Sequence, residues 1–121
     1  MPFVIRKIET VEEKVDVFYP GQKKPEKMPV VVRYITETER KELLDAVSPD
    51  KGRDQMADRD ILLQVISDIP GLVTEDGESL DYSEEVLDQL LDVRCYCSAL
   101  KGLMLSILYG KEFAEKFREK N

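Results

Sequence analysis

Residues 30–47, VVVRYITETERKELLDAV, decide the fold of this chain. At the start of this stretch, Val30, Val32 and Tyr34 fall on one face of an extended segment, a period of two that predicts a half-buried β-strand. From residue 36 onward, the apolar residues recur at helical spacing. Because strand changes to helix within one short stretch, the sequence predicts a mixed α+β fold.

The helical part of this stretch has recognisable ends. Thr36 and Glu39 have the spacing of a capping box, in which a hydroxyl and a carboxylate satisfy each other's unpaired backbone N–H groups. The predicted helix ends before Pro49, because the residue that precedes a proline disfavours helical backbone angles.

Two more strands are predicted ahead of this stretch. Val15, Val17 and Tyr19 fall on one face of an extended segment, and Lys14 and Asp16 fall on the other. Residues 3–8 (FVIRKI) are the predicted antiparallel partner of that strand. The polar residues 9–13 would connect the two strands. Residues 20–28 contain Pro, Gly and three lysines, which predicts a mobile basic loop. Pro29 after this loop fits the first residue of a strand or an edge.

Further helices are predicted after residue 50. Residues 57–69 carry a broad apolar stripe that would end at Pro70-Gly71. A turn is predicted at Asp76-Gly77, and Ser83 has the character of the next helix N-cap. The spacing of apolar residues over 96–108 predicts a last long helix that stops at Gly110.

These elements predict one α+β domain over residues 1–121. A small N-terminal antiparallel sheet, a hairpin plus a third strand, would occupy residues 1–35. A bundle of four or five helices would include residues 36–110. Residues 111–121 form a charged tail, for which a short amphipathic helix and a frayed end are both open.

The net charge of −7 lies mainly in the middle of the chain. Residues 54–110 hold 3 Lys or Arg against 12 Asp or Glu, whereas residues 1–53 hold 11 against 10. A surface this negative repels the phosphate backbone, so nucleic acid is not an expected partner. The charge suits a basic protein partner, the imitation of DNA, or solubility alone.

Residue types exclude several kinds of chemistry. The chain has no histidine, which excludes Ser-His-Asp and Cys-His catalysis and histidine-ligated metal sites. Cys95 and Cys97 are the only cysteines, too few for a zinc site or a disulfide framework. The carboxylates cluster at turns and helix starts, where nothing would raise a pKa for acid–base work. We therefore expect no enzyme, no cofactor and no metal.

The longest near-apolar stretch, residues 103–109, is interrupted by a serine and is too short to cross a bilayer. No apolar run of signal-peptide length occurs at the N-terminus. The expected location is therefore the cytoplasm, with no membrane partner.

Four apolar residues near the C-terminus are candidates for binding a partner. Phe113 and Phe117 lie four apart, and they either fold back onto the core or form an apolar edge for a partner helix. Leu105 and Tyr109 lie off the main inward stripe of the preceding helix and would extend such an edge.

The order of these pieces resembles the small tail assembly chaperones of long-tailed bacteriophages. The resemblance includes the N-terminal strand pair and its Pro-Gly loop, and it spans nearly the whole chain. It is carried by VVVRY at 30–34, TER at 38–40, ISDIPGLV at 66–73, EDGESL at 75–80 and YSEE at 82–85. Many family members have a Trp-x-Gly-Val segment before the acidic turn; here Ile69 stands at the tryptophan position, followed by Gly71 and Leu72.

The resemblance implies a protein that works by binding. Members of that family coat the tape measure protein and keep it soluble until tail-tube subunits polymerise around it, which also implies self-association. Such a chaperone acts in the host cytoplasm and is not expected in the mature virion. The family commonly makes a second, longer product by a ribosomal slip, and Glu119-Lys120-Asn121 can be encoded by the slippery string GAA AAA AAC.

Two alternatives stay open at this point. An acidic inhibitor that imitates DNA would need carboxylates at phosphate-like spacing on one rigid face. A minor tail or connector component would be found in purified virions.

Overall fold

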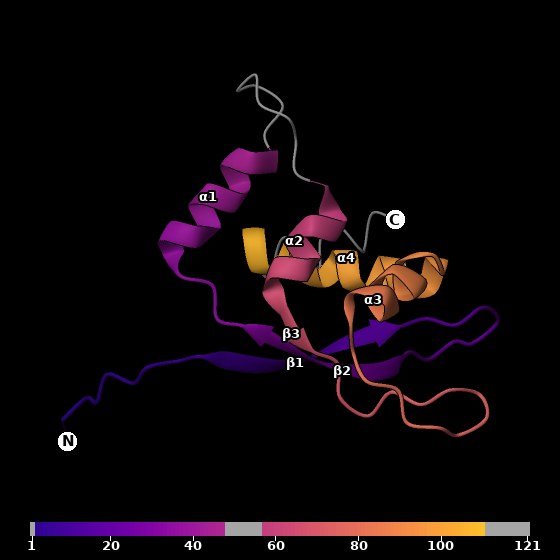
Figure 1. Cartoon of the computed structure of the whole chain (residues 1–121). Coiled ribbons are helices and arrows are strands. Elements are labelled where there is room, and N and C mark those ends of the chain that lie inside the picture. The colour runs from indigo at the N-terminus through magenta and orange to yellow at the C-terminus, as the bar shows by residue number, and fades with distance from the viewer. Residues whose placement is uncertain (1, 48–56, 111–121) are drawn as a thin grey trace.

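A three-stranded antiparallel sheet forms one layer of the molecule, and four helices lie on one side of it (Figure 1). The computed structural model describes residues 2–47 and 57–110. The elements are, in chain order, β1 (Thr10–Val17), β2 (Glu26–Arg33), α1 (Glu37–Val47), α2 (Asp58–Val65), β3 (Ile66–Asp68), α3 (Glu84–Leu91) and α4 (Arg94–Tyr109). The predicted α+β arrangement of a small sheet followed by helices is confirmed.

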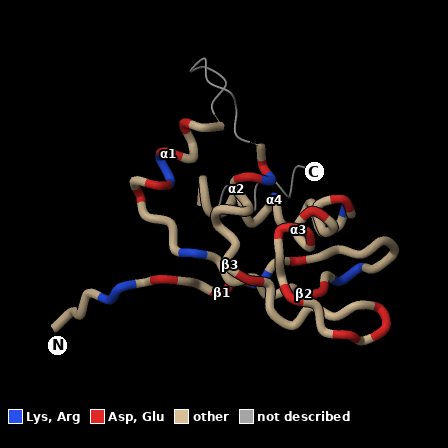
Figure 2. The backbone as a smooth tube through the Cα atoms, in the orientation of Figure 1, with Lys and Arg blue, Asp and Glu red and all other residues tan. Residues whose placement is uncertain are grey.

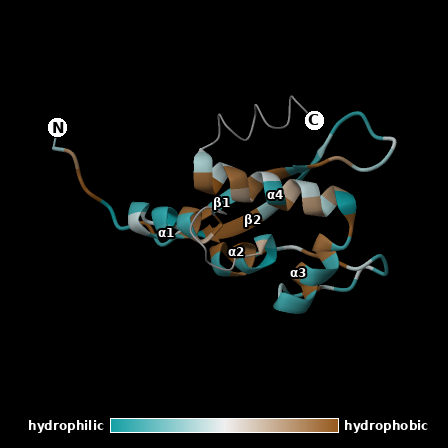
Figure 3. Ribbon diagram, turned by 90° about the horizontal axis from the view of Figure 1, so that it is seen from above, coloured by the Kyte–Doolittle hydropathy of each residue, from teal (hydrophilic) through white to brown (hydrophobic). Residues whose placement is uncertain are grey.

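The sheet has one apolar face. In the β1–β2 hairpin Val15 lies opposite Met28 and Val11 opposite Val32, and directly opposed residues of an antiparallel pair point to the same side. The side chains of Val11, Val15, Val17, Val30 and Val32 therefore face the helices. The alternate residues, most of them charged but including Val31, face the other way. Viewed from the helical side, α4 crosses over these hydrophobic strands (Figure 3).

The predicted pairing of residues 3–8 with the strand at 15–19 is wrong. The partner of β1 is β2, and residues 10–13, expected to be a connection, belong to β1. Residues 2–9 form neither strand nor helix. The physical reason is the alternation: Phe3 and Ile5 would point to one face and Val4 and Ile8 to the other, so a strand here would leave apolar side chains in water on either register.

The third strand of the sheet, β3, lies within residues predicted to be helical. The helix predicted over residues 57–69 ends at Val65, and β3 continues directly from it to pair with β2. Ile66 lies opposite Val32, which gives the exposed edge of β2 a partner and keeps Ile66 buried. Pairing outweighs helical spacing here, because β-branched residues suit a strand as well as they suit the apolar stripe of a helix.

Pro29 lies inside β2, opposite Lys14 of β1. Of the described strands, β3 pairs only with residues 31 and 32 of β2. At Pro29 the strand therefore has a partner on one side, and the missing N–H of proline is tolerated as at an edge.

The predicted caps at Thr36 and Ser83 and the predicted stop at Gly110 are confirmed, whereas the loop predicted over residues 20–28 is shorter, because β2 begins at Glu26. The Thr36 hydroxyl accepts a hydrogen bond from the Glu39 N–H at 3.2 Å, and the Ser83 hydroxyl accepts one from the Val86 N–H at 3.3 Å. Gly110 ends α4 with a φ of 97°, a left-handed angle that suits glycine. The Glu39 carboxylate also accepts a hydrogen bond from the Arg33 guanidinium at 2.7 Å, and this bond is the main cause that lowers the pKa of Glu39.

One hydrophobic core joins the sheet to all four helices. Helix α4 contacts β1 and each of the other helices, and its Leu100 is fully buried. Helix α1 is held to the end of α4 by Arg40, whose guanidinium donates to the Leu108 carbonyl at 2.9 Å. The other fully buried large side chains are Val17, Val30, Ile61, Leu62, Val65, Ile69, Leu87 and Leu108.

Replacing a core side chain and a side chain of residues 2–9, which lie outside the sheet, tests this arrangement. We expect Leu100→Ala to lower the free energy of unfolding by about 2–5 kcal/mol, because it leaves a cavity under the sheet. The matched change Ile5→Ala removes a side chain that is 90 % exposed, and we expect less than about 0.5 kcal/mol. Urea unfolding measures both free energies. If Ile5→Ala lowered the free energy of unfolding about as much as Leu100→Ala, Ile5 would have to be packed in the core, and the exposed position given to it here would be wrong.

Candidate interaction surfaces

An apolar groove lies between the loop that follows β3 and a wall formed by α3 and the start of α4. Its volume is about 260 Å³. The loop provides one wall and the two helices the other. The lining residues are Leu72, Val73, Leu80, Val86, Gln89, Leu90, Val93 and Tyr96.

Hydrogen bonds hold the loop wall of this groove in shape. Val73 and Ser79 form an isolated antiparallel bridge, and the Leu80 N–H donates to the Leu72 carbonyl at 2.8 Å. Gly77 closes the turn between them with a φ of 85°. The loop is therefore a small hairpin that keeps Val73 at the groove with 62 % of its surface exposed.

A pair of tyrosines fixes the end of the groove. The hydroxyls of Tyr19, just after β1, and Tyr96 on α4 are hydrogen-bonded at 2.9 Å, and their rings meet edge to face at 5.7 Å. This hydrogen bond, together with burial, raises the pKa of Tyr19 well above its ordinary value. The pair joins the hairpin to α4 and places the groove at the Val17 end of β1.

The groove lies in the most acidic part of the chain. Residues 70–93 contain eight Asp or Glu and no Lys or Arg, and the loop and α3 are accordingly marked by acidic residues in Figure 2. Arg59 on α2 binds the carboxylates of Glu84 and Asp88 and lowers the pKa of Asp88. The other six carboxylates of residues 70–93 lie on the same loop and helix that form the groove.

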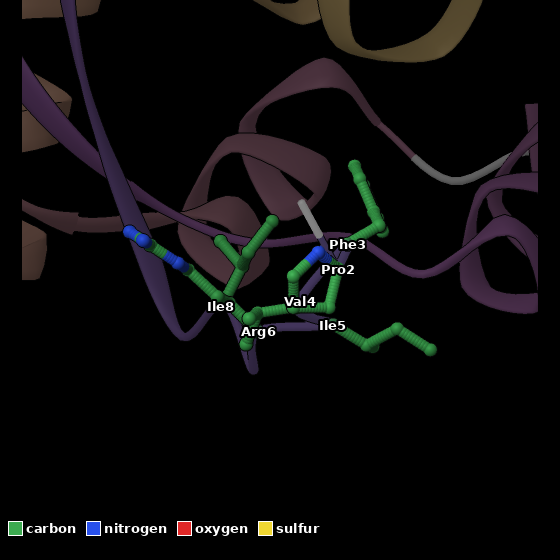
Figure 4. A pocket seen from close by; sticks show the side chains of 6 residues that line it. All are labelled: Pro2, Phe3, Val4, Ile5, Arg6 and Ile8. Carbon is green, nitrogen blue, oxygen red and sulfur yellow. The ribbon is translucent and has the colours of Figure 1, made fainter.

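The N-terminal arm, defined as residues 2–9, extends away from the body of the molecule (Figure 1). Phe3 is 92 % exposed and Ile5 90 %, and Val4 and Ile8 are also exposed. Their side chains spread in different directions around an extended backbone (Figure 4). The hollow of about 620 Å³ along the arm is lined by arm residues alone, so it is the surface of one segment and not an enclosed site. The Tyr34 N–H donates to the Glu9 carbonyl at 2.9 Å and fixes the base of the arm.

The four residues predicted to bind a partner differ in accessibility. Leu105 is half-buried against the core, while Tyr109 at the end of α4 is 48 % exposed. Tyr109 therefore offers the larger accessible surface of the two. Phe113 and Phe117 lie outside the described residues.

Sequence reasoning missed both the groove and the arm as surfaces. The groove had a signal: Leu72, Val73 and Leu80 flank the polar turn on both sides, and apolar residues beside a tight turn come together across it. The arm also had a signal: apolar and polar residues do not alternate along it, so its apolar side chains fall on both faces of an extended chain. A sheet with one buried face could not cover both sets.

Among residues 2–47 and 57–110, no group of three or more Asp, Glu, Cys or His side chains is placed to hold a metal ion. Cys95 and Cys97 are half-buried thiols. In the same part of the chain, no helix has the length and apolar character needed to span a bilayer.

A scan against protein-family models and searches of curated proteins and of solved structures give no match to this chain.

The ion pair of Arg59 with Asp88 predicts an acid-sensitive contribution to stability. Because the pKa of Asp88 is lower in the folded chain than in the unfolded one, its contribution is complete above the unfolded value of about 4 and is lost as the pH falls through the folded value. We expect Asp88→Asn to lower the urea midpoint near pH 6, and this difference from the wild type to shrink near pH 2.5.

Glu75→Gln is the matched control, since Glu75 lies in the exposed turn of the same acidic segment. It should leave the midpoint near pH 6 almost unchanged. A difference for Asp88→Asn that stays constant with pH would contradict the role given to its charge.

Proposed function

We propose that this chain is a tail assembly chaperone of a long-tailed bacteriophage or prophage, which binds the tape measure protein, keeps it soluble and helps to recruit tail-tube subunits. The observation that carries the proposal is exposed apolar surface on a strongly acidic chain. Nine large hydrophobic side chains of the described residues are 45–92 % exposed, on a chain of net charge −7. The resemblance of residues 30–40 and 66–85 to that chaperone family supplies the identity of the partner.

The physical requirements of such a chaperone agree with this surface. A tape measure protein has long helices whose apolar faces aggregate when they are not covered. A binder must present apolar side chains to those faces and remain soluble itself, which a high net charge provides. Tyr109 and Leu105 on α4, with Phe113 and Phe117 after it, are the residues we propose for this contact. The chemistry is binding without catalysis.

One observation favours a second candidate, an acidic inhibitor that imitates DNA. Residues 70–93 carry eight carboxylates without a basic residue. Against it, Glu84 and Asp88 on α3 are already bound by Arg59, which reduces the regular negative face that this helix could present. The two candidates differ in their partner: a helical apolar protein for the first, a DNA-binding protein for the second.

Co-expression tests the chaperone proposal and its contact residues. We expect the tape measure protein encoded beside this gene to be insoluble alone and soluble with this chain. Tyr109→Asp and Phe117→Asp should each weaken the purified complex by about tenfold or more, because a charge would enter an apolar contact. Thr38→Asp is the matched control, an exposed position on α1. Unchanged solubility of the tape measure protein with and without the chain would contradict the proposal.

The gene itself offers an independent test. When it is expressed with an N-terminal tag and its native downstream DNA, we expect a band at 13.9 kDa plus the mass of the tag, and a scarcer longer one on an immunoblot. Synonymous recoding of codons 119–121 should abolish the longer band. A longer band that survives recoding would contradict the proposed slip at this position. Absence of the chain from purified virions, checked by mass spectrometry, separates a chaperone from a tail or connector component.

A further inference from the structure

The groove and the N-terminal arm match each other, and we propose that the arm of one copy of this chain docks in the groove of a second copy. Both surfaces are apolar and exposed to water in the single chain. No described residue of the same chain covers either of them. The inference concerns this chain with itself and does not depend on the proposed function.

The two surfaces are complementary in character. The arm carries Phe3, Val4, Ile5 and Ile8, which are exposed, while the groove floor is formed almost entirely by aliphatic side chains. Burying these arm residues removes apolar surface from water on both sides. An extended segment with little structure of its own is the kind of ligand that an exposed groove accepts on folding together.

The charges are complementary as well. Arg6 and Lys7 lie between the apolar residues of the arm, and the Lys7 ammonium lies 3.9 Å from the carboxylate of Glu9 at the base of the arm. Residues 72–96, which include the whole groove lining, carry eight carboxylates and one basic residue, Arg94. Two of these carboxylates are bound by Arg59 of α2, so six remain to attract the arm. Figure 2 shows the basic residues of the arm and the acidic loop at opposite ends of the molecule. Each copy thus has a basic apolar ligand at one end and an acidic apolar receptor at the other. This arrangement steers the arm of one copy toward the groove of the next.

The length of the arm indicates that the receptor is a second copy. The arm starts at the Thr10 end of β1, and the Tyr19–Tyr96 pair puts the groove at the other end. The strand from Thr10 to Val17 is about 23 Å long. A fully extended arm from Thr10 places Phe3 at most about 24 Å away, so Phe3 would end level with Val17 of its own chain, short of Tyr96.

The contact is heterologous, because it joins two different surfaces of identical chains. Such contacts leave an arm unused at one end of a complex and a groove unused at the other, so copies add head to tail until a ring closes or the supply of chains ends. Growth of the complex with concentration is therefore the direct expectation.

Sedimentation equilibrium of the purified full-length chain tests this inference. We expect the average mass to rise above that of one chain between about 10 μM and about 1 mM. The arm variant Phe3→Asp and the groove variant Val73→Asp should each weaken association by about tenfold or more. The matched control Phe18→Asp changes an exposed phenylalanine outside both surfaces and should associate as the wild type does.

Mixing the two variants gives the decisive result. The Phe3→Asp copy retains an intact groove and the Val73→Asp copy an intact arm, so an equal mixture should form a 1:1 dimer and nothing larger. Circular dichroism of each variant confirms that the fold is kept, as their exposure predicts.

Three outcomes would overturn the inference. One is a wild-type chain that stays a monomer up to about 1 mM. Another is an arm variant that loses association while the groove variant does not, which would place the arm along the open edge of β1 in the second copy. The third is a mixture of the two variants that stays monomeric.

Discussion

The structure depends on one constraint: a three-stranded sheet with four buried valines on one face must be covered on that face. Val15 and Val17 of β1 and Val30 and Val32 of β2 are buried because the register of the hairpin brings them to the same face. Helix α4 covers this face, and the other helices pack against α4. The opposite face of the sheet carries mostly charged residues and is solvated, as is usual for small antiparallel sheets.

The surfaces proposed for binding are those that the core does not use. The loop after β3 is held by its own backbone hydrogen bonds, so it can keep Val73 in water beside α3 without collapsing onto the core. The arm precedes the first residue of the hairpin and has no strand to pair with among the described residues. The acidic residues of the segment that forms the groove give it a net negative charge, and such a charge opposes the association of exposed apolar surfaces. Apolar contact then supplies affinity, and charge selects which segments approach.

A tail chaperone and a self-associating arm are compatible uses of different surfaces. The groove lies at the start of α4, where Tyr96 lines it, whereas Tyr109 lies at the other end of this helix, where Arg40 of α1 donates to the neighbouring Leu108 carbonyl. Copies joined through arm and groove would therefore keep the α4 end available to a second partner. Repetition of one weak apolar contact along a chain of copies gives a total affinity that no single copy has.

The sequence by itself determined the features that depend on neighbouring residues. The caps at Thr36 and Ser83, the turn at Gly77 and the stop at Gly110 each follow from the backbone preference or local hydrogen bond of one residue, and all are found as expected. The α+β class follows in the same way from the change of period after Tyr34. Only the tertiary structure decided which strands pair, because Ile66 suits a helix and a strand equally until β2 offers it a partner. It also decided that residues 3–8 stay outside the sheet and that Leu72, Leu80 and Tyr96 meet in a groove, since these outcomes depend on contacts between residues far apart in the chain.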